Sequence, residues 1–478
     1  MEQKKARRKK NRELYLCTAA FLVLFTVMFG YLVCYVTDNH EEFFNNSYNS
    51  RQRVLAAQNR RGTIYAADGE VLAQTGTDGE GNEKREYPFK EVFAHVVGYS
   101  TKGKTGIEEL ENYSLINSDI SEREKIDNEL AGLKNPGNDV YTTLDTSLQQ
   151  VAYDSLGAFR GAIVVTEVKT GRILAMVSKP DFDPNQIVEI WDRVNADTDN
   201  AVLLNRATQG LYPPGSTFKI VTALGYIRQF PDSWKNYTYQ CNGAYVNGDN
   251  RISCFHGSVH GNVDFMTSFA KSCNSSFANM GMQLDREEFQ NTINGLLFNQ
   301  ELPVPLRYNR TSVELRADSS DEEVIQTSIG QGKTQITPMQ LNMITMSIAN
   351  GGILMEPYLV DRVESAEGKI LKQNNPKQYR QLMASSEAQT LTALMEDVVL
   401  EGTGRGLKDR PYTAAGKTGS AEFNTVKADS HAWFTGFAPA EDPEIAVTVI
   451  VEEVGSGGDY AVPLARRVFD AWFDRSAD

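Results

Sequence analysis

A serine and a lysine three residues apart form the part of the sequence best suited to nucleophilic chemistry. Ser216 follows the run Tyr212-Pro213-Pro214-Gly215, and Lys219 comes one helical turn later. Because proline and glycine favour a rigid turn at which a helix begins, both side chains are predicted on one helical face. A serine hydroxyl becomes a good nucleophile when a neighbouring base removes its proton, and a lysine with a lowered pKa is such a base. The pair therefore predicts a serine that forms an acyl-enzyme.

Each short motif taken alone is a weak signal, because the chain contains further copies of it. Ser-x-x-Lys recurs at Ser268–Lys271, and Ser-x-Asn is found at Ser47–Asn49 and Ser272–Asn274. Lys-Thr-Gly begins at Lys104, Lys169 and Lys417. A lone match of this kind is more often structural or accidental than catalytic, so chain order has to select among the copies.

One combination has the motifs in a consistent order, with room for a helical subdomain between them. It consists of Ser216–Lys219, Ser272–Asn274 and Lys417–Gly419. The residues on either side of Lys417, from Ala414 to Ala421, are small, as expected of an edge strand that pairs with a substrate backbone. Ser-x-x-Lys, Ser-x-Asn and Lys-Thr-Gly in this order are the signature set of penicillin-binding proteins and serine β-lactamases.

The elements that must position these residues indicate an α+β domain. Apolar spacing predicts helices at 148–156, 216–228, 263–280, 338–350 and 463–473. Strands are predicted at 161–168 and 172–178, joined by a turn at Lys169-Thr170-Gly171, and again at 412–422, 432–438 and 444–452. Strands early and late with helices between them predict one sheet that joins distant segments.

The N-terminal region predicts a membrane anchor. Residues 1–13 are strongly basic, and 14–36 form an apolar run without a charged residue. Such a run makes a helix of roughly 35 Å, which spans a hydrocarbon core of about 30 Å. A signal peptide is the competing interpretation, but its apolar part is usually about 7–15 residues and ends at a small-residue cleavage site. The basic flank places the N-terminus in the cytoplasm and the rest of the chain outside.

The remaining chain divides near residue 140, where the composition and the residue pattern change. Residues 37–140 are polar and irregular, with short strands near 62–65 and 71–73 and a flexible loop at 74–86, so they predict a stalk and a small pedestal domain. Residues 141–478 form the predicted catalytic domain. The net charge of −14 argues against a nucleic-acid-binding protein, which would have a basic face.

The cysteines and histidines give no metal-binding pattern in the sequence. Five histidines are scattered and no Cys-x-x-Cys is present, so no metal and no cofactor is expected. Cys241 and Cys254 lie on either side of a Gly/Asn-rich turn. They either pair as a disulfide in an exported domain or remain two buried thiols, and the sequence supports both.

The whole set of motifs resembles the class B penicillin-binding proteins, which are monofunctional transpeptidases with one N-terminal anchor. The resemblance extends through Gly161–Val164, Thr170–Met176, Ile329–Gly332, Thr337–Gln340 and His431–Phe437, and includes Arg61–Ile64 near the anchor. It implies a penicillin-binding transpeptidase fold, similar to serine β-lactamases, behind the anchor and a mostly β pedestal. One departure is Ala66-Ala67, where relatives usually carry Asp-Arg, so the pedestal contact of that pair is not expected in this chain.

The resemblance also implies roles for the site residues. Ser216 attacks the carbonyl between two D-Ala residues, Lys219 is its base, Ser272 relays a proton to the leaving D-Ala, and Asn274 binds the substrate peptide. Lys417 assists the relay and attracts the terminal carboxylate, which Thr418 and Ser420 of the Thr418-Gly419-Ser420 segment contact. The backbone N–H groups of Ser216 and Ser420 form the oxyanion hole.

The implied activity is peptidoglycan D,D-transpeptidation on stem peptides ending in D-Ala-D-Ala, with covalent inhibition by β-lactams. A serine β-lactamase shares the motifs but needs no anchor or pedestal. A D,D-carboxypeptidase differs only in using water as the acceptor, so serine-type D-Ala-D-Ala carboxypeptidase chemistry stays open beside transpeptidation. A non-catalytic β-lactam sensor is disfavoured because the catalytic set is complete. The implied partner is a membrane glycan polymerase of the SEDS type.

Overall fold

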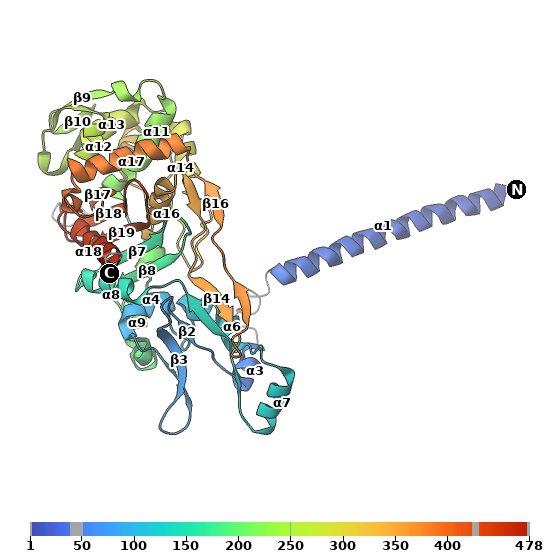
Figure 1. Cartoon of the computed structure of the whole chain (residues 1–478). Coiled ribbons are helices and arrows are strands. Elements are labelled where there is room, and N and C mark those ends of the chain that lie inside the picture. Colours follow the sequence, from blue (N-terminus) through green and yellow to red (C-terminus); the bar gives the residue numbers. More distant parts are fainter. Residues whose placement is uncertain (1, 39–50, 249, 423–429, 476–478) are drawn as a thin grey trace.

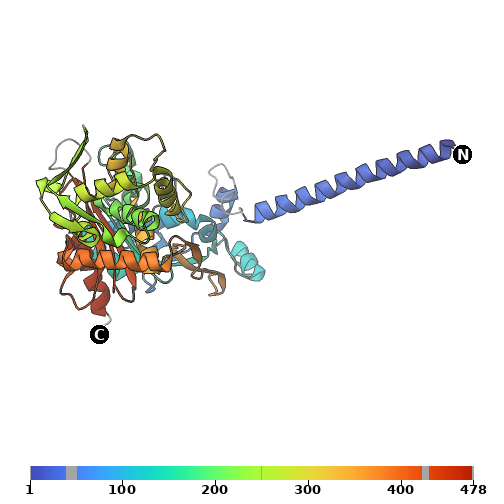
Figure 2. The ribbon, with the colours of Figure 1, turned by 90° about the horizontal axis from the view of Figure 1, so that it is seen from above.

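The computed structural model describes residues 2–38, 51–248, 250–422 and 430–475. Its first element is helix α1 (Glu2–Asp38), which lies apart from the rest of the chain in both views of the ribbon (Figure 1, Figure 2). Within it, Asn11–Thr37 is long and apolar enough to cross a membrane, and its most apolar part is not buried by any other segment. The predicted anchor therefore forms one continuous helix.

A six-stranded sheet forms most of the pedestal, in the order β15-β14-β6-β2-β3-β4. Four of its strands are β2 (Ile64–Tyr65), β3 (Val71–Thr77), β4 (Glu83–Glu86) and β6 (Asp139–Thr142). The other two, β14 (Val360–Glu364) and β15 (Ile370–Gln373), come from much later in the chain, and β14 pairs antiparallel with β6. The sheet thus takes two strands from beyond the predicted boundary at residue 140.

Residues 74–86, predicted as a flexible loop, instead contain much of a β-hairpin. Strand β3 continues to Thr77, β4 begins at Glu83, and the two pair antiparallel. The charged composition that suggested a loop belongs to an edge strand, where charged side chains hinder pairing with another chain. The loop prediction was therefore wrong, because composition alone does not distinguish a charged edge strand from a loop.

Short helices and one small ladder complete the pedestal. The helices are α3 (Arg51–Gln58), α4 (Ala94–Val97), α5 (Gly106–Leu110), α6 (Asn112–Ile116) and α7 (Glu122–Leu130). Strand β1 (Asn59–Arg60) pairs in parallel with β5 (Asn135–Pro136).

A buried carboxylate joins the first pedestal residues to α5. Glu108 is fully buried and accepts hydrogen bonds from Arg61 Nε at 2.6 Å, Arg85 Nε at 2.7 Å and the Tyr87 hydroxyl at 3.1 Å. Burial alone would raise the pKa of Glu108, but the two guanidinium groups together lower it below its usual value. The carboxylate is therefore charged and holds two cations that are themselves nearly buried.

We expect Glu108→Ala to destabilise the pedestal by about 3–5 kcal/mol, because it leaves Arg61 and Arg85 buried without their anion. The loss of stability is measured by chemical denaturation of the full chain in detergent, with cleavage of the pedestal by a protease as the signal of its unfolding. Glu109→Ala is the matched control, since the neighbouring Glu109 pairs with Arg307 at the surface and such a pair contributes about 0–1 kcal/mol. Equal stability of the two variants would contradict the role assigned to Glu108.

A five-stranded antiparallel sheet forms the centre of the catalytic domain, in the order β17-β18-β19-β7-β8. Its strands are β7 (Gly161–Glu167), β8 (Ile173–Lys179), β17 (Ala415–Glu422), β18 (Ser430–Ala438) and β19 (Ile445–Val451). The two terminal segments of the domain meet where β7 pairs with β19. The predicted joining of distant strands is thus confirmed, and β17 is left at an edge.

Helices cover both faces of this sheet, which explains its nearly continuous apolar strands. Helices α8 (Thr146–Leu156) and α18 (Ala461–Asp474) pack together against one face. Helix α16 (Pro338–Ala349), buried along its whole length, packs against β7 and β19 on the other face. Helix α17 (Ser385–Leu400) packs against the edge strand β17.

A mainly helical lobe lies at the end of the molecule away from the pedestal (Figure 1). Its helices are α11 (Lys219–Gln229), α12 (Phe265–Ala270), α13 (Asn274–Gln283), α14 (Arg286–Gly295) and α15 (Asp321–Ser328). Four short strands belong to the same lobe: β9 (Thr238–Cys241), β10 (Ala244–Asn247), β11 (Asn250–Ser253) and β12 (Gly261–Asp264). The other elements are α9 (Ile187–Ala196), α10 (Arg206–Gln209), β13 (Ile353–Met355) and β16 (Gln378–Gln381).

Two predicted helices differ from the structure at functional positions. The helix predicted to begin at Ser216 starts with a 3-10 turn over Gly215–Phe218 before α11. The helix predicted over 263–280 is broken between α12 and α13, and Ser272 in the break has a φ of +55°. The apolar periodicity continues through this break, so it gave no sign that the helix is interrupted there.

Candidate active site

Three segments meet around one cleft: the turn that carries Ser216, the break between α12 and α13, and the edge strand β17. The cleft has a volume of about 870 Å³, and its lining includes Ser216, Ser272, Asn274, Thr418 and Ser420. The motif copies selected by chain order therefore come together in space. The sequence predicted this grouping of the three motifs.

The turn before α11 is held tightly against β17. Gly215 has a φ of +53°, and a Cβ atom at this position would lie 2.9 Å from the Ser420 carbonyl oxygen. The Gly215 N–H donates to the Gly330 carbonyl at 2.9 Å, and the Trp433 indole donates to the Pro213 carbonyl at 3.1 Å. Glycine is thus required for both the backbone conformation and the close approach that brings Ser216 beside the strand.

Lys219 is fully buried beneath the Ser216 hydroxyl. Its Nζ lies 3.1 Å from Ser216 Oγ and 3.2 Å from Ser272 Oγ. The same nitrogen lies closer to two carbonyl oxygens, the Ser272 main chain at 2.7 Å and Asn274 Oδ1 at 2.6 Å. Burial lowers the pKa of Lys219 to about 8, so about a tenth of the amine is neutral at pH 7.

These contacts orient a neutral lysine amine as a base. A neutral amine has two N–H donors and one lone pair, and the two carbonyl oxygens, from Ser272 and Asn274, take the two donors. The lone pair is then left for the hydroxyl protons of Ser216 and Ser272. The arrangement meets the geometric requirement for a general base, which is hydrogen-bond reach of the proton it removes.

Lys417 contacts Ser272 from the side opposite Lys219. Its Nζ lies 2.9 Å from Ser272 Oγ and 3.0 Å from the Thr418 carbonyl. Burial and the nearby Lys219 both lower the pKa of Lys417 well below its ordinary value. Ser272 thus bridges two buried amines, and a proton can pass along this chain of three groups.

Strand β17 forms one wall of the cleft. Thr418 contacts the hydroxyl of Thr403, a residue that no sequence motif indicated. A Cβ at Gly419 would lie 3.0 Å from both the Pro214 carbonyl and the Thr217 methyl group, so glycine lets the strand approach the Ser216 turn. The Ser420 side chain is partly exposed toward the cleft and accepts a hydrogen bond from the Gly457 N–H at 3.3 Å.

The other motif copies among the described residues do not contact Ser216 or Lys219, although Lys271 lines the cleft. Ser268 is buried with its hydroxyl 2.7 Å from Ser276 Oγ, and Lys271 is exposed. Lys104 lies 3.4 Å from Gln52 in the pedestal, and Lys169 pairs with Asp442 at 3.4 Å in the hairpin turn. The copy at 47–49 lies outside the described residues.

The prediction that the cysteines and histidines form no cluster was wrong. Cys241, Cys254, His260 and Cys273 lie with their Sγ and ring nitrogen atoms within 4.8 Å of one another. The Cys241 and Cys254 sulfurs are 3.6 Å apart, so the structure has the buried thiols and not the disulfide. Short ligand spacing is the signal that sequence reasoning uses, and here folding brings together residues from four separate segments.

A second buried network, also without a sequence signal, supports the residues before Ser216. Glu452 accepts hydrogen bonds from Arg206 Nε and the Tyr212 hydroxyl, each at 2.7 Å, and from Arg160 Nε at 2.9 Å. Burial alone would raise the pKa of Glu452, but Arg206 and the Tyr212 hydroxyl help to lower it below its usual value. The carboxylate therefore fixes Tyr212, four residues before the serine.

We expect Glu452→Ala to lower the rate of acylation at Ser216 about 10–100-fold, because small displacements at a reacting group carry costs of this order. The variant should also lose about 3–5 kcal/mol of stability, since Arg206 stays buried without its anion. Stopped-flow labelling with a fluorescent penicillin measures the rate on the folded fraction. Arg160→Ala, which removes the more exposed partner, is the control and should retain nearly full rate.

Comparison with known proteins gives a consistent result over both folded parts. Residues 161–470 match the family described as penicillin binding protein transpeptidase domain, and residues 61–140 match that described as penicillin binding protein A dimerisation domain. The peptidoglycan D,D-transpeptidase PbpA of Mycolicibacterium smegmatis is 32% identical over 456 residues, which cover 88% of this chain and 91% of that protein.

Solved structures show the same likeness. A D,D-transpeptidase domain of a peptidoglycan glycosyltransferase from Eggerthella lenta has a TM-score of 0.79 and 30% identity, covering 88% of this chain and 99% of its own. Penicillin-binding protein A from M. tuberculosis, solved as a ceftriaxone acyl-enzyme complex, has a TM-score of 0.79 and 29% identity, covering 87% and 99%.

Proposed function

This chain belongs to the class B penicillin-binding proteins, and from that membership we propose that it is a peptidoglycan D,D-transpeptidase that works through an acyl-enzyme on Ser216. The observation that carries the proposal is the position of Lys219 Nζ, in reach of the Ser216 and Ser272 hydroxyls at one cleft. The substrate class is a stem peptide ending in D-Ala-D-Ala, and relatives that are named peptidoglycan D,D-transpeptidases support it.

Acylation begins when Ser216 Oγ attacks the carbonyl carbon between the two D-Ala residues and its proton passes to Lys219 Nζ. The charge that develops on the carbonyl oxygen is stabilised by the backbone N–H groups of Ser216 and Ser420; one such donor contributes about 10²–10³ in rate. As the C–N bond breaks, Ser272 passes a proton from Lys219 to the leaving amine. Free D-Ala departs, and the ester on Ser216 remains.

The terminal carboxylate of the substrate binds at β17. Thr418 and Ser420 present two hydroxyls to the cleft, and the buried Lys417 amine beside them adds positive charge that attracts the carboxylate. Binding of an anion favours the charged form of Lys417, which burial otherwise disfavours. A β-lactam carries a carboxylate in the same relation to its reactive carbonyl, so penicillins acylate Ser216 as well.

The second half-reaction depends on the acceptor of the acyl group. An amine from a neighbouring stem peptide gives a cross-link, whereas water gives D,D-carboxypeptidase activity on the same ester. An assay with a D-Ala-D-Ala peptide donor and a D-amino acid acceptor, read by mass spectrometry, measures the two products together. We expect more of the exchanged peptide than of the hydrolysed one. If the hydrolysed peptide predominates, the activity is that of a carboxypeptidase and not of a transpeptidase.

The reaction takes place outside the cell membrane. The basic residues 1–13 favour a cytoplasmic N-terminus, and α1 then carries the chain across the bilayer. The peptidoglycan substrate is on the outer side, which agrees with this orientation. Protease added to intact spheroplasts should digest the catalytic domain. Protection of that domain would mean that it lies in the cytoplasm, the opposite of the proposed topology.

The expected partner is a membrane glycan polymerase of the SEDS type, contacted through α1 and the pedestal. A transpeptidase without its own polymerase needs a source of new glycan strands close to its active site. Co-purification from membranes with α1 intact, and again with α1 replaced by an unrelated membrane helix, tests the contact. Failure to recover a polymerase with the intact anchor would contradict the partnership.

A further inference from the structure

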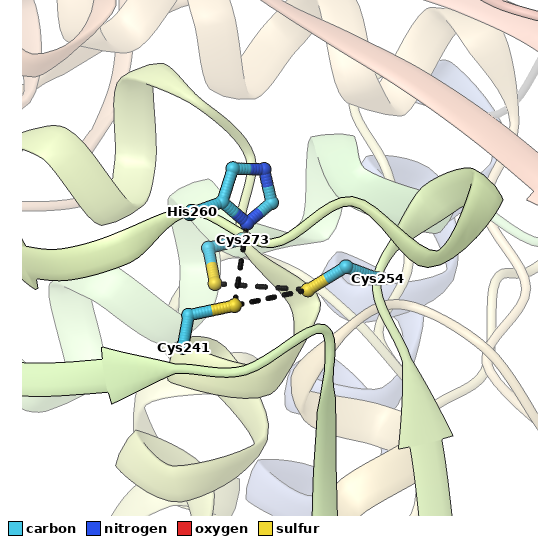
Figure 3. A group of neighbouring side chains, drawn as sticks. All are labelled: Cys241, Cys254, His260 and Cys273. Carbon is cyan, nitrogen blue, oxygen red and sulfur yellow. Dashed lines mark hydrogen bonds between the residues drawn. The ribbon is translucent and has the colours of Figure 1, made fainter.

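Three cysteines and one histidine meet beside the cleft, at the point where α13 begins. Cys241 ends β9, Cys254 follows β11, His260 precedes β12, and Cys273 immediately precedes α13. Their side chains point toward one centre from these four segments (Figure 3). We propose that the four side chains bind one Zn²⁺ ion, and that this ion holds the Ser272–Asn274 turn in place.

The distances between the ligand atoms fit a tetrahedral zinc site. With Zn–S bonds of about 2.3 Å and a Zn–N bond of about 2.0–2.1 Å, the edges of the tetrahedron are about 3.8 Å between two sulfurs and about 3.6 Å between sulfur and nitrogen. The Cys241 and Cys254 sulfurs are 3.6 Å apart, and those of Cys254 and Cys273 are 3.8 Å apart. The Cys241 sulfur lies 3.4 Å from His260 Nδ1.

The three thiols do not form part of the main apolar cores. Free cysteine often packs in a core as a small hydrophobic side chain. Here Cys241, Cys254 and Cys273 form a separate buried cluster. Among the described residues, the partly buried Tyr239 packs against this cluster. Small lobes with few buried apolar residues often depend on a metal for their stability, and this segment is built from two-stranded ladders and turns.

Neighbouring groups suit thiolate ligands. The buried Ser275 hydroxyl lies 2.9 Å from the Cys254 sulfur, to which it can donate, and 3.6 Å from that of Cys241. Such outer partners orient metal ligands and tune the site. His260 is only half-buried, which gives an ion a path to the centre from solvent.

The ligand set favours zinc over other metals. Three thiolates and one imidazole in tetrahedral geometry are typical of structural zinc, while hard cations such as Mg²⁺ and Ca²⁺ require oxygen ligands. Binding releases the thiol protons to solvent, and His260 binds as the neutral ring. All four positions are filled by the protein, so the ion has a structural role and does not act on substrate.

The ion would act directly on the catalytic geometry. Cys273 is the middle residue of the Ser-x-Asn motif, between Ser272 and Asn274, and Ser272 holds its φ of +55° without the tolerance of glycine. The Asn274 amide donates to the Ser253 carbonyl at 3.1 Å, next to Cys254. Cys273 is thus bonded to Ser272 and Asn274, which contact Lys219. Cys254 is bonded to Ser253, which contacts Asn274.

Metal content of the full chain tests the site. The protein is produced with a tag that contains no histidine and purified in detergent without chelator, and zinc is measured by mass spectrometry. We expect about one zinc per chain in the wild type and less than about a tenth of that in His260→Asn and Cys254→Ser. His256→Asn, an exposed histidine in the same loop, is the matched control and should keep its zinc.

Cobalt gives a readout that does not depend on the variants being folded. Wild-type protein stripped by chelator and reloaded with Co²⁺ should show tetrahedral ligand-field bands and thiolate-to-cobalt charge transfer. A chain without zinc and without these bands overturns the proposal. So does a Cys241–Cys254 disulfide, detected after alkylation without reductant as two cysteines that carry no alkyl group, in a peptide two hydrogens lighter than its unalkylated dithiol form.

The positioning role rests on the proposed function and is measured separately. Stripped wild-type protein should react with a fluorescent penicillin about 10–100-fold more slowly, and added Zn²⁺ should restore the rate. Zinc bound at full stoichiometry with an unchanged rate after stripping would remove the positioning role while leaving the site. Absence of labelling in every form would instead contradict the acyl-enzyme on Ser216.

Discussion

Ser216→Ala should abolish covalent labelling by penicillins and reduce transpeptidation by at least about 10⁴-fold, because no other group replaces the lost nucleophile. The side chain is small and partly exposed at the cleft, so its removal leaves the fold intact. Intact-protein mass spectrometry after exposure to a β-lactam gives the result directly. The wild type gains the mass of one ligand, and the variant keeps its own mass.

Ser268→Ala is the control that separates the two Ser-x-x-Lys serines. Its hydroxyl is buried against Ser276 Oγ, so the change removes one hydrogen bond worth about 1 kcal/mol and no reacting group. This variant should label at the wild-type rate. Equal labelling of Ser216→Ala and the wild type would overturn the assignment of Ser216 as the nucleophile; absence of labelling in the wild type would favour a non-catalytic scaffold.

The catalytic set could be predicted because its members depend on local sequence and fixed order. The spacing of Ser216 and Lys219 places both on one helical face, and the small residues around Lys417 suit an edge strand. The structure brings these residues together with Ser272 and Asn274. Their catalytic roles remain predictions that the variants test.

The groups that hold this set in place could not be predicted. Glu452 reaches Arg206 and Tyr212 across more than two hundred residues of chain, and no local pattern records such a contact. The same holds for the convergence of the cysteines with His260, whose segments are joined only by the fold. Buried charges and metal ligands are selected by tertiary geometry, whereas motifs record only sequence separation.

Secondary structure failed where the backbone departs from its local preference. The break at Ser272 interrupts an apolar pattern that fits a single helix, and tertiary contacts to Lys219 hold that conformation. Strands β14 and β15 pair with the pedestal although they lie beyond the predicted boundary at residue 140. Both departures place residues where side chains from distant segments can meet.

Lys219→Ala should slow acylation about 10²–10⁴-fold, the usual contribution of a general base. The change also leaves the Asn274 amide oxygen without its 2.6 Å partner, so the binding of the substrate peptide weakens as well. Lys235→Ala, which removes an exposed lysine outside the lining of the cleft, is the control and should react normally. Normal acylation of Lys219→Ala would assign the base to another group.

The pH profile tests the same role without a mutation. Only the neutral amine can accept the Ser216 proton, and burial lowers the pKa of Lys219 to about 8. Below that pH the neutral fraction falls tenfold per unit, so the acylation rate at pH 6 should be about a hundredfold below its plateau. Above pH 8 the rate should level off, and in Lys219→Ala this bend should disappear. A bend retained in the variant would mean that Lys417, whose pKa is also lowered and which contacts Ser272 from the other side, removes the proton instead.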